Sequence, residues 1–133
     1  MAEFRTIKIE KHQYTAFLDK ATSFYNGMID AKSRGNWVQA CSSAVHCTIS
    51  SCDAVTTYFL GERSASIRHD DLARLVQRIS LPDADEKSKQ IAQVLSVKSR
   101  VEYSAETLSQ KQALTMTLQA GRIYEWARQI TSK

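Results

Sequence analysis

A scarcity of chain-breaking residues is the feature that most constrains the fold of this sequence. One proline, Pro82, and four glycines interrupt 133 residues. β-Sandwiches and barrels need a turn about every 8–12 residues, and glycine and proline supply much of that turn chemistry. The chain is also 43% hydrophobic and 24% charged, which are ordinary values for a globular protein. The sequence therefore predicts long helices in an all-α fold, and it excludes a disordered or collagen-like chain.

Apolar side chains recur at three- and four-residue spacing, which places them on one face of a helix. This spacing predicts five helical segments: residues 14–34, residues 37–60, a short helix carrying Leu72 to Ile79, residues 86–103, and a last helix reaching Ile130. A chain of this length makes one domain, residues 1–133, with its core within about residues 14–131. We therefore expect an up-down bundle of about five helices without strands.

Local signals mark the ends of these helices. Gly35 and Gly61 follow the first two segments, and glycine is common just after the end of a helix. The capping signals at helix starts are Asn36 with Gln39 for the second segment, and Ser109 with Gln112 or Thr107 with Gln110 for the last one. The first two helices are thus joined by a very short connection, which predicts that they pack antiparallel.

The second predicted helix has two contrasting faces. Its apolar arc covers more than half of the circumference, which is typical of a central helix with several neighbours. A stripe of polar side chains, about 100° wide, occupies the remainder: Gln39, Ser42, Ser43, His46, Ser50, Asp53 and Thr57. A serine in the middle of a helix has no free backbone N–H groups for an oxyanion hole, so a Ser-His-Asp relay is not supported. We interpret Ser42, His46, Ser50 and Asp53 as an interface with a second copy of the chain, or as a face exposed to solvent.

The cysteines do not form a metal-binding pattern. Cys41 and Cys52 share a helix face but lie eleven residues apart, roughly 16 Å along the axis. Cys47 and His46 point elsewhere, whereas a zinc site gathers its ligands around one point. We therefore expect no metal and no cofactor. The odd number of cysteines, and the lack of an apolar signal segment or an 18-residue apolar window, predict a cytoplasmic protein with reduced thiols.

Basic residues in two places could contact phosphate. The net charge of +4 is a mild excess spread along the chain. Arg63, Arg68 and His69 precede the third helix, where a histidine could transfer a proton and an arginine could stabilise charge on a phosphodiester. Arg100 and Tyr103 end the fourth helix, where the arginine could bind phosphate and the tyrosine could stack on a base. The structural alternatives are a hydrated loop with capping carboxylates at the first place and an ion pair between Arg100 and Glu102 at the second.

Three segments together resemble the HEPN family (higher eukaryote and prokaryote nucleotide-binding) from about Tyr14 to Ile130. They read NWVQACSSAVHCTISSCDAVTTYFLGE, RHDDLARLVQRI and KSRVEYSAETLSQKQALTMTLQAGRIYEWARQI. The resemblance implies a helical bundle that forms a homodimer. It also implies a possible nucleotidyltransferase partner, because many members of the family form toxin–antitoxin pairs with such an enzyme.

Some members of this family are metal-independent ribonucleases with a histidine four to six residues after an arginine. Arg100 would be the matching arginine, but the three histidines of this chain all precede it. The resemblance therefore implies a module that binds a nucleotide or RNA through Arg100, Tyr103 and Arg68 without catalysis. An endoribonuclease toxin that uses Arg63 and His69 is the first alternative. A purely structural interaction bundle is the second.

Overall fold

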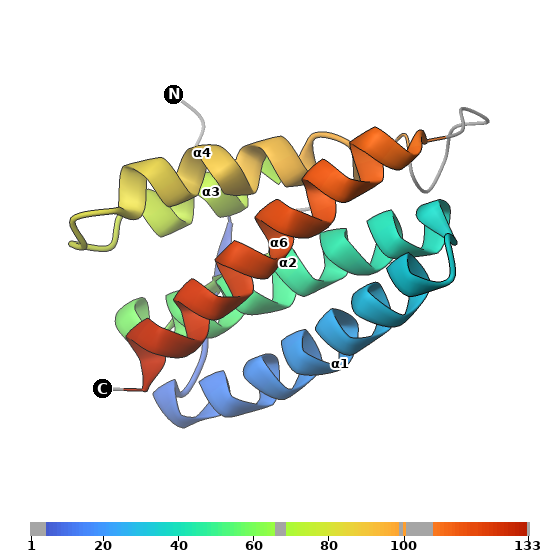
Figure 1. Cartoon of the computed structure of the whole chain (residues 1–133). Coiled ribbons are helices and arrows are strands. Elements are labelled where there is room, and N and C mark those ends of the chain that lie inside the picture. Colours follow the sequence, from blue (N-terminus) through green and yellow to red (C-terminus); the bar gives the residue numbers. More distant parts are fainter. Residues whose placement is uncertain (1–4, 66–68, 99, 101–107, 133) are drawn as a thin grey trace.

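The computed structural model is an all-α bundle and describes residues 5–65, 69–98, 100 and 108–132 (Figure 1). The helices are η1 (Lys11–Gln13), α1 (Tyr14–Ser33), α2 (Trp37–Leu60), α3 (His69–Gln77), α4 (Ala84–Leu95) and α6 (Gln110–Thr131). The fold class and the expected number of long helices are therefore confirmed within the described residues. For His69 and Asp70 the structure describes the backbone alone.

The predicted helix ends at Asn36, Gly61 and Ser109 are confirmed. The Asn36 side chain accepts a hydrogen bond from the Gln39 backbone N–H at 3.3 Å. Gly61 has a φ of 66°, a left-handed conformation that is costly for residues with a Cβ. Ser109 and Gln112 form a reciprocal capping box at the start of α6. These ends depend on contacts within a few residues, which is why the sequence alone predicts them.

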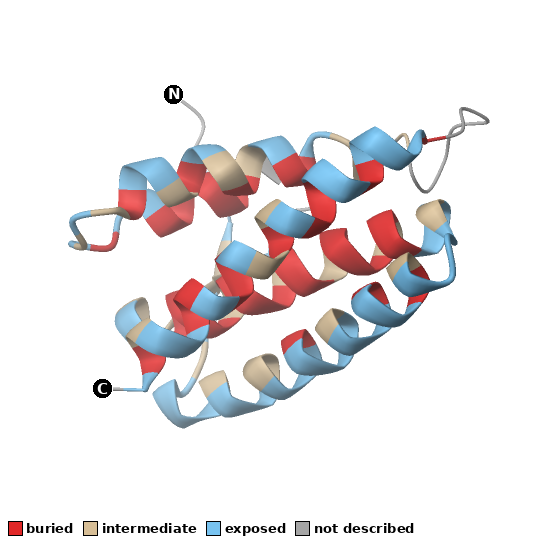
Figure 2. Ribbon diagram, viewed as in Figure 1, coloured by how far each residue is buried: buried red, intermediate tan, exposed pale blue. Residues whose placement is uncertain are grey.

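Helix α2 is the central element of the bundle, as its wide apolar arc predicts. It contacts α1, α3, α4 and α6, and in Figure 1 α6 crosses in front of it with α1 on one side and α4 on the other. Figure 2 shows the difference in burial: α2 is largely buried, whereas the outer face of α1 is exposed. The predicted inward side chains of the short third helix, Leu72, Leu75, Val76 and Ile79, are all buried.

The expectation of a fold without strands is wrong in one place. Thr6–Lys8 forms strand β1, which pairs antiparallel with strand β2, Glu62–Ser64. The Thr6 hydroxyl donates a hydrogen bond to Glu62 across this pair at 2.6 Å. The two strands are 56 residues apart in sequence at this contact. The pair is not a hairpin with a short turn, so no local turn signal in the sequence predicts these two strands.

The fourth helix ends earlier than the sequence predicts. Helix α4 stops at Leu95, and Ser96 and Val97 form a turn, although the apolar pattern predicts a helix to residue 103. The Ser96 hydroxyl donates a hydrogen bond to the Gln93 carbonyl at 2.8 Å. Serine competes for backbone partners in this way and favours helix ends. Residues 101–107, which include the predicted Tyr103, lie outside the described residues.

Candidate functional site

A groove between α4 and α6 is the best candidate for a functional site. Its volume is about 550 Å³, within the range of about 300–1,000 Å³ that is common for ligand sites. Arg100, predicted from the sequence as a binding residue, lines this groove. The full lining consists of Gln93, Ser96, Val97, Arg100, Leu108, Lys111, Gln112, Thr115, Met116 and Gln119.

The described charges of the groove have one sign. Arg100 and Lys111 supply two cations, and no carboxylate belongs to the lining among the described residues. Arg100 is half-buried, and the Lys111 ammonium has neither an ion pair nor a hydrogen bond among the described residues. Two neighbouring cations attract an anion. Lys111 was not predicted from the sequence, because its place beside Arg100 depends on how α6 lies against α4.

The floor of the groove is apolar. Met116 is 5% exposed and Leu108 is 7% exposed, and both belong to the hydrophobic core. Val97, half-buried, packs against the same core. A ligand pocket of this kind combines an apolar floor with a few polar groups that fix the orientation of the ligand.

The polar side chains of the groove differ in how many of their hydrogen-bonding groups are already used within the chain. The Gln112 side chain accepts a hydrogen bond from the Ser109 backbone N–H at 2.9 Å, which holds it in the capping box. Thr115 donates to the Lys111 carbonyl at 3.1 Å. The Gln119 amide donates to the Gln93 amide oxygen at 2.8 Å, which bridges α6 and α4. The Gln93–Gln119 pair therefore retains donor and acceptor capacity for a ligand.

Of the residues of the predicted ribonuclease site, the structure describes the side chain of Arg63 alone. Arg63 lies half-buried in β2, where its charge acts on Asp53 of α2. The His69 backbone begins α3, but its side chain is outside the description, and Arg68 lies outside the described residues altogether. The observed electrostatic neighbour of Arg63 is thus a carboxylate.

The polar stripe on α2 is covered in part by the chain itself. Ser43, Ser50 and Thr57 are 5%, 7% and 0% exposed, so the alternative of a face exposed to solvent is wrong at these three positions. His46 stacks on Phe24 of α1, with ring centroids 5.2 Å apart. A Cβ at Gly27 of α1 would lie 3.6 Å from the Ser43 hydroxyl, which shows how closely α1 approaches. Ser42, His46 and Asp53 keep intermediate exposure and remain candidates for an interface.

Asp53 is electrostatically unusual. Burial raises the pKa of its carboxyl from 3.8 to about 7, against the opposing effect of the nearby Arg63 and Lys20 cations. Loss of hydration disfavours the charged form of a carboxyl, and here that effect exceeds the attraction of two cations. The carboxyl of Asp53 therefore titrates close to neutral pH.

The three cysteines are core residues. Cys41, Cys47 and Cys52 are free thiols and fully buried. Burial raises the pKa of Cys41 to about 11 and that of Cys47 to about 12. These two thiols hold their protons at neutral pH, whereas metal ligation and nucleophilic attack need a thiolate. Within the described part of the chain, no three His, Cys, Asp or Glu side chains are grouped as metal ligands.

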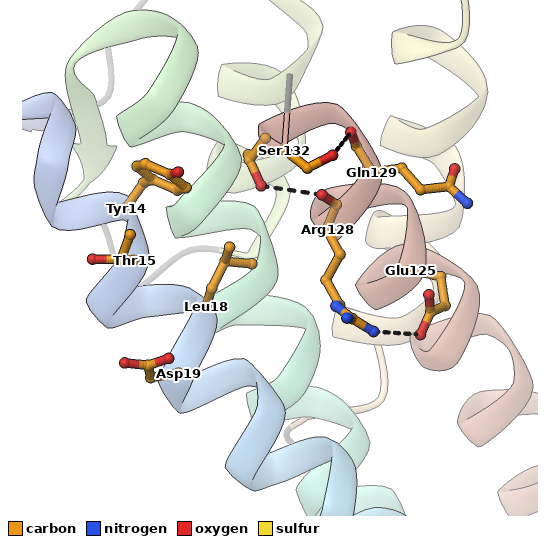
Figure 3. Close-up of a pocket in the computed structure, with 9 residues that line it drawn as sticks. Tyr14, Thr15, Leu18, Asp19, Glu125, Arg128, Gln129 and Ser132 are labelled. Carbon is orange, nitrogen blue, oxygen red and sulfur yellow. Dashed lines mark hydrogen bonds and ion pairs between the residues drawn. The ribbon is translucent and has the colours of Figure 1, made fainter.

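A second cavity, between the start of α1 and the end of α6, is a weaker candidate (Figure 3). Its volume is about 460 Å³. Its arginine, Arg128, is engaged by the chain itself, with an ion pair to Glu125 at 3.4 Å and a position 5.6 Å from the centroid of the Tyr124 ring. Asp19 adds a further carboxylate to the lining. This cavity is therefore less suited to an anion than the groove between α4 and α6.

Comparison of the sequence with protein-family models finds no match, and comparison with curated proteins finds no significant relative. Across the part of the chain that the structure describes, every helix is too short or too polar to cross a membrane.

Proposed function

We propose that this protein is a HEPN-like module that binds a nucleotide or RNA in the groove between α4 and α6 and does not cleave it. The observation that carries the proposal is the composition of the groove, whose described lining combines Arg100 and Lys111 with an apolar floor and includes no carboxylate. The sequence resemblance supports the same ligand class, because it singles out Arg100 independently of the structure.

The chemistry of the groove suits a phosphate attached to an apolar ring. An arginine binds phosphate oxygens with two parallel N–H groups, and a lysine adds a mobile point charge. Bases lie favourably on apolar or aromatic side chains because every base has a π-face. Leu108 and Met116 offer such a surface beside the two cations.

The absence of catalysis is proposed from the composition of the groove. General acid–base catalysis needs a titratable group within hydrogen-bond reach of the reacting atoms. Among the described residues that line the groove, no histidine or carboxylate is present, and Arg100 and Lys111 are the charged groups. The described side chains of the groove can hold a phosphodiester but include no base to activate a 2′-hydroxyl.

The wider setting of the proposal follows from the sequence resemblance. It comprises a cytoplasmic homodimer and a nucleotidyltransferase partner within a toxin–antitoxin pair.

The endoribonuclease alternative is tested by incubating the purified protein with labelled total RNA in EDTA, beside the His69→Ala variant. Intact RNA is expected with both proteins. Cleavage that disappears in the variant would establish the ribonuclease instead.

We expect Arg100→Gln to weaken binding of labelled single-stranded RNA or nucleotide by about tenfold or more, because a hydrogen bond to a charged group contributes about 1.5–3 kcal/mol. Lys111→Gln should act in the same direction. Isothermal titration calorimetry measures the affinity, and thermal melting should show nearly unchanged stability.

Arg128→Gln is the matched control for this experiment. It removes the same charge from the second cavity, which lies outside the groove. Binding should be unchanged in this variant. If Arg100→Gln binds as the wild type does, or if Arg128→Gln weakens binding equally, the groove is not the site.

The proposed dimer interface is tested by a substitution in the accessible part of the polar stripe on α2. Ser42 has intermediate exposure, whereas arginine at the buried Ser50 would disrupt the fold of the chain itself. We expect Ser42→Arg to convert the dimer to a monomer in sedimentation experiments, because two like charges would meet across a symmetric interface. A dimer that persists in this variant would exclude the stripe as its interface.

A further inference from the structure

We infer that strand β1 pairs edge to edge with β1 of a second copy of this chain, in an antiparallel register that places the two Ile7 residues opposite each other. The contact joins the two-stranded ribbons of two copies into one four-stranded sheet. It goes beyond the proposed function, because it concerns a surface at the β1–β2 ribbon and not the groove between α4 and α6.

The hydrogen bonds of the ribbon show which backbone groups of β1 are already used. The Ile9 backbone N–H donates to the Gly61 carbonyl at 3.0 Å, and the Ala65 backbone N–H donates to the Arg5 carbonyl at 3.0 Å. In an antiparallel pair, residues that bond to the partner strand alternate with residues whose N–H and C=O groups point away from it. Residues 5, 7 and 9 therefore face β2, and residues 6 and 8 face outward.

The outer edge of β1 is open. Among the described residues, the backbone groups of Thr6 and Lys8 have no hydrogen-bond partner. Strand β2 contacts α2 and α3, whereas β1 has no comparable contact with a helix in the described part of the chain. A row of unpaired backbone N–H and C=O groups is a template for a further strand.

One register lets the open edges of two copies pair completely. A twofold axis at Ile7 places Thr6 opposite Lys8 of the second copy, and Lys8 opposite Thr6 of the second copy. Each of these pairs exchanges two N–H···O bonds, so all outward groups of β1 are used. An axis at Thr6 would use only one such pair within β1. An axis at Lys8 would place two lysines directly opposite each other, which is destabilising.

The side chains of β1 agree with this register. Ile7 is 42% exposed in the single chain, and the axis buries it against its counterpart, which stabilises a strand pair. Lysine on an edge strand discourages pairing where like charges meet. Here Lys8 lies opposite a threonine, and its neighbour across the ribbon is Glu62. The charges and the apolar side chain therefore complement an identical strand, and the occupant of the edge is a second copy.

The edge contact is separate from the proposed interface on α2. Ser42 lies near the start of α2, whereas β2 follows the end of this helix at Leu60. The two positions are about 27 Å apart along the helix axis. A pairing of such short strands is weak by itself, so the edge stays open in dilute protein. Rising concentration then joins copies of the chain through β1 as well.

Disulfide trapping tests the register. Ile7→Cys places two thiols across the axis, where the Cα atoms of a non-hydrogen-bonded pair are about 4.5 Å apart, within reach of a disulfide. Lys8→Cys is the matched control, because its two copies are offset by two residues along the strands and lie about 8 Å apart. Under mild oxidation with diamide, Ile7→Cys should yield several-fold more covalent dimer than Lys8→Cys. The native cysteines are fully buried, so the wild type sets the background.

A second variant removes hydrogen bonds of the contact and leaves the ribbon intact. Lys8→Pro deletes an outward N–H, and proline is tolerated on an edge strand where the N–H faces solvent. In sedimentation equilibrium, the average mass of the wild type should rise with concentration. The association constant of Lys8→Pro should be lower by about tenfold or more. Lys8→Gln loses the charge but keeps the N–H, and it should associate as the wild type does. Thermal melting should be the same for all three proteins.

Three outcomes would overturn the inference. Equal cross-linking of Ile7→Cys and Lys8→Cys contradicts the register, and no cross-linking of either leaves the edge to a strand of a different protein. Association of Lys8→Pro as strong as that of the wild type contradicts pairing through the backbone. A wild-type mass that does not change with concentration contradicts the contact altogether. Since none of these measurements involves a nucleotide or RNA, the proposed function stands or fails separately.

Discussion

The Asp53→Asn variant is expected to be more stable than the wild type at pH 8, by an amount on the order of 2–4 kcal/mol. Burial raises the pKa of Asp53 to about 7 in the folded protein, from an ordinary value of 3.8. Between these values the folded chain holds a proton that the unfolded chain has lost, so the wild type loses stability as the pH rises from about 4 to about 7. Above about pH 7 the folded wild type carries a buried negative charge, which lowers its free energy of unfolding. Asparagine at position 53 carries no charge, so the variant does not lose this stability.

Urea unfolding at several pH values measures this effect. The wild-type free energy of unfolding should fall across the window, whereas the curve of Asp53→Asn should be flatter. At pH 8 the melting temperature of the variant should be higher by about 10 °C. Asp19→Asn removes a carboxylate from the exposed surface of α1 and should retain the wild-type profile. A variant at Asp53 that is destabilised at pH 8, with an unchanged pH dependence, would contradict the burial of this carboxyl.

The Ile123→Ala variant is expected to lose about 2–5 kcal/mol of unfolding free energy. Ile123 is fully buried on α6 and belongs to the main hydrophobic core, which also includes residues of α2, α3 and α4. Removing its branched side chain forfeits apolar burial and leaves a cavity that close-packed neighbours fill only in part. Chemical denaturation monitored by circular dichroism measures the loss.

Leu118→Ala is the control on the same helix. Leu118 is 54% exposed, so shortening its side chain should change stability by no more than about 0.5 kcal/mol. The comparison removes any general effect of alanine on helix α6, because both variants introduce the same residue. Equal losses from the two variants would show that α6 does not bury Ile123 as described.

The sequence predicts those parts of the fold that depend on nearby residues. The ends at Asn36, Gly61 and Ser109 follow from capping groups within three or four positions. The central place of α2 follows from its broad apolar arc. The pairing of β1 with β2 is beyond such reasoning, because Thr6 and Ser64 are far apart in sequence and lie on either side of α1 and α2.

One charged residue of the candidate site is predicted from the sequence. Arg100 is found from the sequence, whereas Lys111 and the Gln93–Gln119 bridge depend on the approach of two helices. In the polar stripe on α2, residues that the sequence places at the surface are buried in the structure. A polar residue is expected at the surface, but a helical hydroxyl can bond to its own backbone, as Thr48 does to the Ala44 carbonyl at 2.9 Å. Side chains of this kind are compatible with burial, so polarity alone misplaces Ser50.

The pairing of β1 with β2 has a mechanical consequence. A pulling force applied through the N-terminal end reaches β1, held by its ladder to Glu62–Ser64, before it reaches α1. In a force-extension experiment this pair should rupture first and release the segment ahead of η1 while the helices remain folded. Rupture would occur at low force, because a two-stranded ribbon this short is only marginally stable by itself.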